Sequence, residues 1–305
     1  MKGTLITLIG PTAIGKTNIS LVLSEKLKTE IISCDARKFY KELKIGTAPP
    51  DEEARRRIPH HFIGHLSIHQ YYTARDFERD ALTKLEKLFA RYSVVIMVGG
   101  SGFYEKALTQ GLDRFPETYP KIRKDLITLF KKEGLIPLQK ELKKKDPVYY
   151  QMVDKNNHQR ILRALEIIRT SCLPFSSFLF HQKKKNRFFR TIKIGLNSPR
   201  EFLYERINQR VNDMMQKGLL EEARLYFPNK DLNALKTVGY RELFSYFEGR
   251  LSLERAIEEI KKNTRHYAKR QLTWYRNDPE VTWFEPDHIN EIFAYIKNIR
   301  PEKRV

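Results

Sequence analysis

One octet near the N-terminus constrains the chain more than any other feature. Gly10–Thr17 reads Gly-Pro-Thr-Ala-Ile-Gly-Lys-Thr, which fits the phosphate-loop pattern G-x-x-x-x-G-K-[ST] without a mismatch. The apolar run 4–9 before it predicts a strand, and apolar spacing over 17–28 predicts a helix. Glycines allow backbone N–H groups to surround an anion at a helix N-terminus. Lys16 can then reach a terminal phosphate and the Thr17 hydroxyl can bind Mg²⁺. An ordinary glycine-rich turn is the alternative.

Length and composition indicate a globular chain. The 305 residues, 41% of them hydrophobic, suffice for one large domain or two smaller ones. The longest apolar runs have about five or six residues, against the roughly twenty of a membrane-spanning helix. Cleavage of the N-terminal apolar run as a signal peptide would destroy the phosphate loop, so we expect a cytoplasmic protein. Cys34 and Cys172 form no C-x-x-C pair, which argues against a disulfide framework or a zinc finger.

The charge balance is the most informative bulk property. Lysine and arginine number 57 against 37 acidic residues, a formal charge of +20. Such an excess favours a polyanionic partner, nucleic acid first, although a solvated lysine-rich surface is the alternative. From about 114 to 190 the lysine runs 143–145 and 183–185 flank helical patterns, and no strand pattern occurs. We expect a helical insertion at 114–190 and a core formed by 1–113 and 191–305.

Two further strands are predicted to deliver side chains to the loop. The apolar run 30–34 ends at Asp35, and the run 94–98 ends in a turn containing Ser101. Carboxyl ends of parallel strands share one crevice, so Asp35 should lie near the loop; a residue that only caps the following turn is the alternative. The glycine-rich turn with the Ser101 hydroxyl suits a second contact with phosphate oxygens. P-loop ATPases usually carry an acid after the second of these strands, and its absence weakens a nucleotide hydrolase reading. The pattern predicts an α/β fold: a P-loop NTPase-like core with a mostly parallel sheet flanked by helices, plus the all-helical insertion.

Later segments add cations. Arg206 and Arg210 lie four apart on a predicted helix over 199–218 and share a face suited to phosphate or to salt bridges. A long helix over about 252–276 carries cations interleaved with aromatics, a combination that suits phosphate contacts and base stacking. Further elements are expected as a helix over 73–91, a strand at 191–196, an edge strand at 281–284 and a closing helix at 289–299. The pair His60-His61 is interpreted as hydrogen-bonding or packing residues rather than metal ligands.

Several stretches together resemble one family, the tRNA dimethylallyltransferases (IPP transferase family). Their order and spacing run from residue 4 to about 285. They are Gly10–Thr17, Ile32–Asp35, Gly46–Ala48, Pro59–His61, Val98–Gly102, Gln159–Ile161, Arg206–Arg210 with Met214, Val238–Tyr240, Asn263–Arg265 and Ala268–Trp274.

The resemblance implies transfer of a dimethylallyl group from dimethylallyl diphosphate to the N6 amine of an adenosine in tRNA. The acceptor would be the adenosine 3′ of the anticodon in tRNAs that read codons beginning with U. The loop would then hold a diphosphate leaving group, with Mg²⁺ as cofactor. Asp35 would be the base, and the adenine would be flipped into a channel opposite the prenyl donor. The expected partner is the anticodon stem-loop of tRNA, and nothing requires more than a monomer.

The resemblance also assigns residues to roles. The expected catalytic residues are Lys16, Thr17 (with the metal), Asp35, Ser101 and Arg210. The expected diphosphate-binding residues are Gly10, Pro11, Thr12, Ala13, Ile14, Gly15, Lys16, Thr17, Arg206 and Arg210. The residues expected to contact tRNA are Arg37, Gln159, Arg160, Arg163, Arg265, Lys269, Arg270, Trp274 and Arg276.

The chain departs from the family pattern beside the proposed base. Where the family commonly has serine and glutamine, this sequence has Ala36 and Lys38, and Ser101 stands where threonine is frequent. The Gly46–Pro49 loop also lacks a lysine that often precedes its proline. Two alternatives stay open: a P-loop small-molecule or nucleoside kinase, and a divergent tRNA-binding paralogue without catalysis.

Overall fold

The computed structural model describes residues 2–179 and 186–299, which form two compact units. The first consists of Met1–Thr109 with Arg187–Val305, and the second of Gln110–Asn186. The boundaries expected from the sequence lie four residues further along at each end (114 against 110, 190 against 186). The lysine run 183–185 lies outside the described residues.

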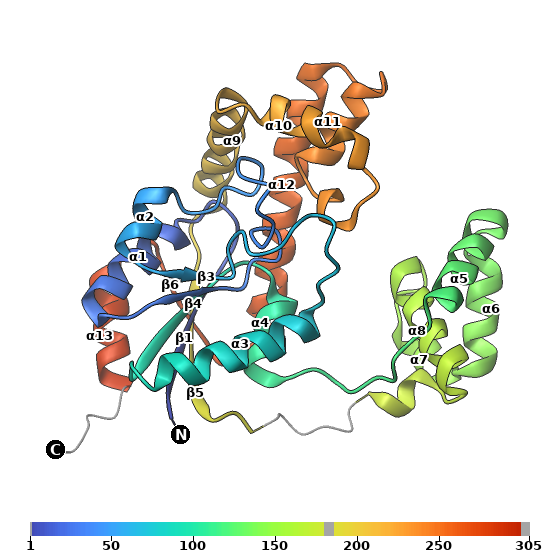
Figure 1. Ribbon diagram of the computed structural model, residues 1–305, viewed down its shortest axis with the longest axis horizontal. Helices are drawn as coiled ribbons and strands as arrows, with labels where there is room; N and C mark the ends of the chain where they lie inside the picture. The colour runs from blue at the N-terminus through green and yellow to red at the C-terminus, as the bar shows by residue number, and fades with distance from the viewer. Residues whose placement is uncertain (1, 180–185, 300–305) are drawn as a thin grey trace. The chain divides into compact units, whose positions relative to one another are not determined.

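A six-stranded parallel sheet forms the centre of the first unit (Figure 1). Its spatial order is β3-β2-β4-β1-β5-β6, and every pairing is parallel. The strands are β1 (Gly3–Ile9), β2 (Ile31–Ser33), β3 (His60–His61), β4 (Val94–Val98), β5 (Phe189–Leu196) and β6 (Val281–Phe284). The predicted α/β class and the edge position of 281–284 are confirmed. Strand β4 (Val-Val-Ile-Met-Val) is apolar along its whole length, as expected for a strand of a parallel sheet whose two faces are both buried.

The helices of the first unit are α1 (Lys16–Leu27), α2 (Glu52–Arg57), α3 (Ala74–Phe89), α4 (Gly102–Gln110), α9 (Arg200–Gln216), α10 (Leu219–Tyr226), α11 (Tyr240–Phe247), α12 (Leu253–Arg276) and α13 (Ile289–Ile299), with short 3₁₀ turns η2 (Phe227–Asn229) and η3 (Asn233–Leu235). Helices α1 and α3 pack against the strands, whereas α10 and α11 pack on α9 and α12, away from the sheet (Figure 1). Ile19 of α1 and Ile292 of α13 pack in one apolar core, whereas Phe77 and Leu85 of α3 pack in another. The sequence pattern did not assign α10 and α11.

Local signals explain where the predicted helices begin. Thr73 and Asp76 form a capping box at the start of α3, each side chain bonding the other's backbone N–H. Pro199 is the N-cap of α9 rather than a residue of its first turn. Both helices therefore begin within a residue or two of the expected position, the usual scatter of helix ends.

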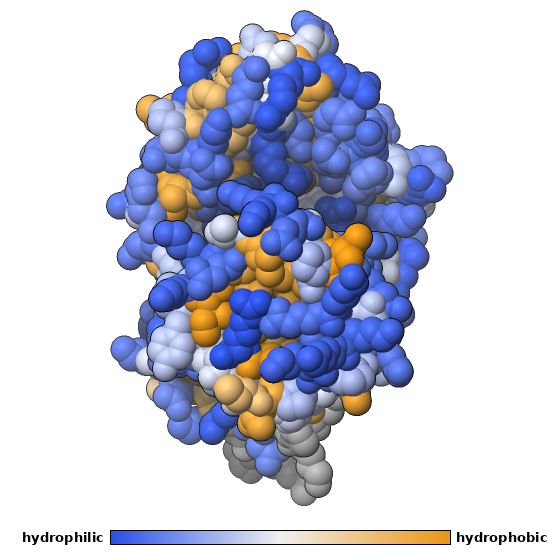
Figure 2. Space-filling view, turned by 90° about the vertical axis from the view of Figure 1, so that its right-hand side faces the viewer, coloured by the Kyte–Doolittle hydropathy of each residue, from blue (hydrophilic) through white to orange (hydrophobic). Residues whose placement is uncertain are grey.

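The described part of the second unit contains only helices. They are α5 (Pro120–Glu133), α6 (Ile136–Lys145), α7 (Pro147–Met152), α8 (His158–Ser171) and the 3₁₀ turn η1 (Phe175–Phe178). The unit has its own apolar core, which includes Leu126, Leu138 and Leu165. The surface seen in Figure 2 is mostly hydrophilic, with apolar side chains exposed between the polar ones. Within the described residues no helix has the length and apolar character needed to span a membrane.

A buried acid secures the edge of the sheet. Glu30, just before β2, accepts from Tyr92 at 2.8 Å, pairs with His61 at 2.7 Å and contacts Arg91 at 3.2 Å. The His60 ring bonds the Ile58 carbonyl at 2.7 Å, so both histidines hydrogen-bond, as interpreted from the sequence. Burial acts to raise the pKa of Glu30, but hydrogen bonds from His61 and Tyr92 outweigh it, and the pKa lies below its usual value.

We predict that Glu30→Gln destabilises the fold by about 1–3 kcal/mol at neutral pH, because it breaks this buried network. A carboxylate with a lowered pKa stabilises the fold above its unfolded pKa and loses this contribution as pH falls through the folded pKa. The difference in melting temperature between wild type and Glu30→Gln should therefore shrink between about pH 6 and pH 3. Glu86→Gln on the exposed face of α3 is the matched control. A pH-independent difference would contradict the role of the charge.

Candidate active site

The phosphate loop lies between β1 and α1, as the octet predicts. Gly10 and Gly15 have φ values of 141° and 105°, which favour glycine. A Cβ on Gly10 would also lie 2.6 Å from the Leu196 carbonyl oxygen of β5. Gly15 is the N-cap of α1 and supplies no side-chain cap, so the first N–H groups of the helix remain available to an anion.

Lys16 lies folded against this loop. Its Nζ donates to the carbonyl oxygens of Gly10 at 2.9 Å and Pro11 at 2.6 Å. Burial, together with the neighbouring cations Lys38 and Arg210, lowers the pKa of Lys16 to about 7, whereas Asp35 acts to raise it. The ammonium therefore lies among like charges, an arrangement that a bound anion would relieve.

Gln271 of α12 connects the loop to the turn after β4. Its Oε1 accepts from the Thr12 N–H at 2.8 Å and its Nε2 donates to the Gly100 carbonyl oxygen at 2.8 Å. A Cβ on Gly100 would lie 2.0 Å from that Nε2, so the glycine is required for this approach. The amide thereby fixes the distance between two loops that follow neighbouring strands.

Asp35 lies at the end of β2 with one carboxylate oxygen committed. Its Oδ1 accepts from the Arg37 N–H at 3.1 Å, whereas no hydrogen bond to its Oδ2 occurs among the described residues. The Ser101 Oγ accepts from the Ala36 N–H at 3.1 Å and contacts the Tyr267 hydroxyl. Burial and the Asp35 charge raise the pKa of Tyr267 to about 12, so its hydroxyl stays neutral at physiological pH.

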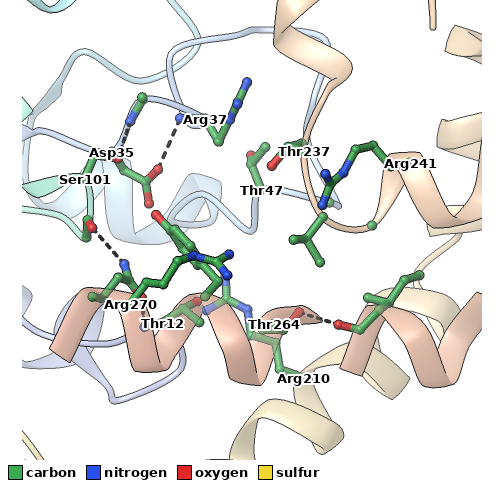
Figure 3. Close-up of a pocket in the computed structure, with 18 of the residues that line it drawn as sticks. Thr12, Asp35, Arg37, Thr47, Ser101, Arg210, Thr237, Arg241, Thr264 and Arg270 are labelled. Carbon is green, nitrogen blue, oxygen red and sulfur yellow. Dashed lines mark hydrogen bonds between the residues drawn. The ribbon is translucent and has the colours of Figure 1, made fainter. Parts of the chain in front are cut away.

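Two cavities adjoin at these residues. The larger measures about 550 Å³ and the smaller about 360 Å³. Asp35 and Ser101 lie on one side of the larger cavity, and Thr237 and Arg241 lie on the other (Figure 3). The smaller cavity is lined by the phosphate loop. The residues common to both are Thr12, Asp35, Gly100, Arg210, Tyr267 and Gln271.

Both arginines predicted to share a face of α9 line the smaller cavity. The Arg206 Nε donates to the Ala13 carbonyl oxygen of the loop at 2.9 Å, and its guanidinium lies over the Phe202 ring. Arg210 lies deeper, where burial lowers its pKa although Asp35 acts to raise it. The smaller cavity can therefore bind an anion through backbone N–H groups and guanidinium groups together.

A third hollow of about 30 Å³ lies beside Thr17, large enough for one water or ion. Thr17, Ser33, Asp35 and Lys38 are among the residues that line it. No group of three His, Cys, Asp or Glu able to hold a metal occurs in the part of the chain that the structure describes. Three hydroxyl residues (Thr17, Ser20 and Ser33) and one carboxylate residue (Asp35) line this hollow. They fit Mg²⁺ only as an ion shared with a bound phosphate, since Mg²⁺ commonly combines few protein ligands with phosphates and waters.

Comparisons with known proteins agree with this geometry. A family model described as IPP transferase matches residues 38–278. The tRNA dimethylallyltransferase of Christiangramia forsetii is 54% identical over 98% of this chain and 99% of its own, and that of Flavobacterium johnsoniae is 50% identical over 96% of each. This chain belongs to the IPP transferase family.

Solved structures support the same assignment. The tRNA isopentenylpyrophosphate transferase of Bacillus halodurans is 32% identical and superimposes with a TM-score of 0.72, covering 97% of this chain and 96% of its own. A eukaryotic dimethylallyltransferase acting on tRNA is 25% identical, with a TM-score of 0.82 over 99% of this chain and 81% of its own. The predicted family and P-loop-like fold are confirmed.

The tRNA-contact residues expected from the resemblance to the IPP transferase family lie in different surroundings. Arg270 and Trp274 line the larger cavity and, with Lys269, a hollow of about 400 Å³ on α12. Arg276 is exposed, whereas Arg265 donates to Asn208 at 2.7 Å.

The remaining residues that are expected to contact tRNA differ in whether they already bind other parts of the protein. Arg37 donates to the Asn233 carbonyl oxygen at 2.9 Å. On α8 of the second unit, Gln159 and Arg160 are exposed, and Arg163 pairs with Glu166 at 3.0 Å. Gln159 Nε2 lies 3.0 Å from the His158 Nε2, an exposed contact that a partner could replace.

Sequence reasoning assigned no role to Tyr267 or Gln271. With Thr264 and Trp274 they recur at intervals of three and four on α12, so they share one face, and all four line the larger cavity. This spacing was the available signal.

We predict that Gln271→Leu weakens binding of inorganic pyrophosphate about tenfold, a loss of ~1.4 kcal/mol. The substitution leaves the Thr12 N–H and the Gly100 carbonyl without their partner and releases the loop from the turn after β4. Titration calorimetry and thermal unfolding measure the two effects. Gln216→Leu, at an exposed position of α9, should change neither. Unaltered affinity in Gln271→Leu would show that the loop holds its shape without this link.

Proposed function

We propose that this member of the IPP transferase family transfers a dimethylallyl group from dimethylallyl diphosphate to tRNA. The acceptor is the N6 amine of the adenosine 3′ of the anticodon, in tRNAs that read codons beginning with U. The supporting observation is that Asp35 and Arg210 line both adjoining cavities. The proposed base, Asp35, and a cation that would stabilise the leaving group, Arg210, therefore both lie at the junction of the two cavities. This is where the prenyl donor and the acceptor amine would react.

The smaller cavity is the proposed donor site. The N–H groups of the loop and of α1, with Lys16, Arg206 and Arg210, would bind the diphosphate. Breaking the allylic C–O bond places negative charge on the leaving diphosphate, and cations already fixed in position lower that barrier. Ser101 and Thr12 would lie at the inner edge of this donor site, beside Gln271.

Mg²⁺ is the proposed cofactor, with the Thr17 hydroxyl as its protein ligand. When bound, it would supply further positive charge to the diphosphate oxygens. Lys16 from the loop and Arg210 from α9 would orient the diphosphate.

The larger cavity is the proposed acceptor site. A stacked adenine exposes its amine poorly, so the base would be flipped into this cavity. The free Asp35 Oδ2 would accept a hydrogen bond from the N6 amine and take its proton as nitrogen attacks carbon. Ser101 would support this geometry because it holds the Ala36 N–H, and with it the turn that carries Asp35.

The tRNA arm would lie on basic surfaces. The excess of positive charge favours phosphate binding, and the α12 residues Lys269, Arg270 and Trp274 suit phosphate contact with base stacking. We propose that the helical unit, through Gln159 and Arg160, also contacts the anticodon stem-loop. A monomer acting on tRNA in the cytoplasm is the simplest assembly consistent with this function.

A small-molecule kinase is the less favoured alternative. The turn after β4 presents Gly99, Gly100 and Ser101 where a P-loop ATPase usually has an acid. A non-catalytic tRNA-binding protein would have no need of an uncommitted carboxylate oxygen at the junction of two cavities.

We predict that purified protein with Mg²⁺ and labelled dimethylallyl diphosphate labels an unmodified tRNA that carries adenosine 3′ of its anticodon. The same tRNA with guanosine at that position is the matched control and should stay unlabelled. Salt-sensitive tRNA binding without transfer would support the non-catalytic alternative. Phosphate transfer from ATP to a small molecule would support the kinase.

We predict that Asp35→Ala and Asp35→Asn reduce turnover by about 10²–10⁴-fold, the usual contribution of a general base. Neither substitution removes a cation from the protein surface that is proposed to bind tRNA, so tRNA affinity should change by less than about threefold. Single-turnover transfer and filter binding measure the two quantities. Parallel losses of turnover and of tRNA affinity would contradict the role of Asp35 as base.

A further inference from the structure

The side chain of Lys38 lies beside the phosphate loop and has no hydrogen-bonding partner among the described residues. Its backbone N–H donates to the Asp35 carbonyl oxygen at 3.0 Å, which closes the turn after β2. Its side chain lines both the smaller cavity and the hollow beside Thr17, and the only other residues that line both are Lys16, Thr17 and Asp35. Among the described residues, the Lys38 ammonium forms no hydrogen bond and no ion pair.

The charges around Lys38 are mostly positive. Burial lowers the pKa of Lys38; Arg210 acts in the same direction and Asp35 opposes it. Lys38 in turn lowers the pKa of Lys16. An unpaired, partly buried ammonium is costly. Three cations held close together without an equal number of carboxylates indicate a site that is completed by an anion.

A charge count gives the size of the imbalance. The charged residues that line the smaller cavity are four cations (Lys16, Lys38, Arg206, Arg210) and two anions (Asp35, Asp213), so the net charge is 4 − 2 = +2. Without Lys38 it would be +1. A diphosphate carries several negative charges, so Lys38 supplies half of the net positive charge that protein side chains offer it.

Lys38 lies beside the hollow in which the proposed Mg²⁺ would bind. Thr17, the proposed Mg²⁺ ligand, and Lys38 line the same 30 Å³ hollow, which has room for about one water or ion. A lysine ammonium is a compact point charge on a flexible stem. It can therefore approach the phosphate oxygens that the metal would otherwise neutralise.

We propose that Lys38 is a second diphosphate-binding lysine, and that its ammonium takes over part of the charge neutralisation supplied by Mg²⁺ beside Thr17. This inference rests on the proposed function, because it takes diphosphate as the ligand. It assigns to the chain an ability to bind diphosphate without metal. Lys16 and Arg210 would contact the diphosphate from the loop and from α9, and Lys38 from the side of the hollow.

The test is titration calorimetry of inorganic pyrophosphate with the full-length protein, in EDTA and in saturating Mg²⁺. We expect Lys38→Gln to weaken binding about tenfold or more in EDTA, or ~1.4 kcal/mol, and less than about threefold in Mg²⁺. Lys38→Arg, which keeps the charge, should stay within about threefold of wild type in EDTA. In transfer assays, the Mg²⁺ concentration for half-maximal activity should rise severalfold in Lys38→Gln.

Lys41→Gln, at an exposed position in the same segment, is the matched control and should bind pyrophosphate like wild type. Thermal unfolding of each variant separates a folding defect from a binding defect. Equal losses of affinity in EDTA and in Mg²⁺ would overturn the inference, because they would show that Lys38 does not share the task of the metal. Unchanged affinity in both conditions would overturn it as well.

Failure of this inference and failure of the proposed function can be told apart. Pyrophosphate binding requires neither tRNA nor prenyl transfer. Metal-free binding that depends on Lys38 in a protein that labels no tRNA would defeat the proposed function alone. Labelled tRNA together with pyrophosphate binding that is insensitive to Lys38 would defeat this inference alone.

Discussion

The site depends on the parallel pairing of β2, β4 and β1. Because the three strands run in the same direction, the segments that follow them begin at one edge of the sheet. These segments carry Asp35, Ser101 and the phosphate loop. A carboxylate, a hydroxyl and the phosphate loop, which are distant in the sequence, thus become neighbours. Gln271 then fixes the spacing of two of these segments through hydrogen bonds at 2.8 Å to Thr12 and to Gly100.

Because these segments converge at one edge of the sheet, their cationic side chains lie close together. The loop contributes Lys16, the turn after β2 contributes Lys38 and α9 contributes Arg210, and the charge of Asp35 acts to raise the pKa of each of them. Repulsion among the cations destabilises the empty site, and this energy is recovered when an anion binds. Donors fixed in this way do not reorganise when negative charge develops, which is how preorganised sites lower a barrier.

The sequence predicted those parts of the fold that depend on local signals. The loop fixed β1 and α1, and Thr73 with Asp76 marked the start of α3. Apolar runs predicted the parallel strands, so Asp35 and Ser101 could be placed at the same edge of the sheet. The side-chain links between distant segments could not be predicted in this way. Gln271 and Tyr267 belong to the site through tertiary contacts, and a helical pattern alone does not say which polar residue of a face will meet a loop.

Arg37 illustrates how such a contact changes a role. The resemblance to the IPP transferase family predicts that Arg37 contacts tRNA, and in the structure its guanidinium donates to the carbonyl oxygens of Asn233 and Ala234 at 2.9 and 3.2 Å. Its backbone N–H meanwhile holds the Asp35 Oδ1. The segment after Ala234 continues into Lys236 and Thr237, which line the larger cavity. Arg37 therefore connects Asp35, the proposed general base, to the wall of the larger cavity formed by Lys236 and Thr237. A nucleobase of tRNA would pass this wall, so movement of the wall would be transmitted to the Asp35 carboxylate.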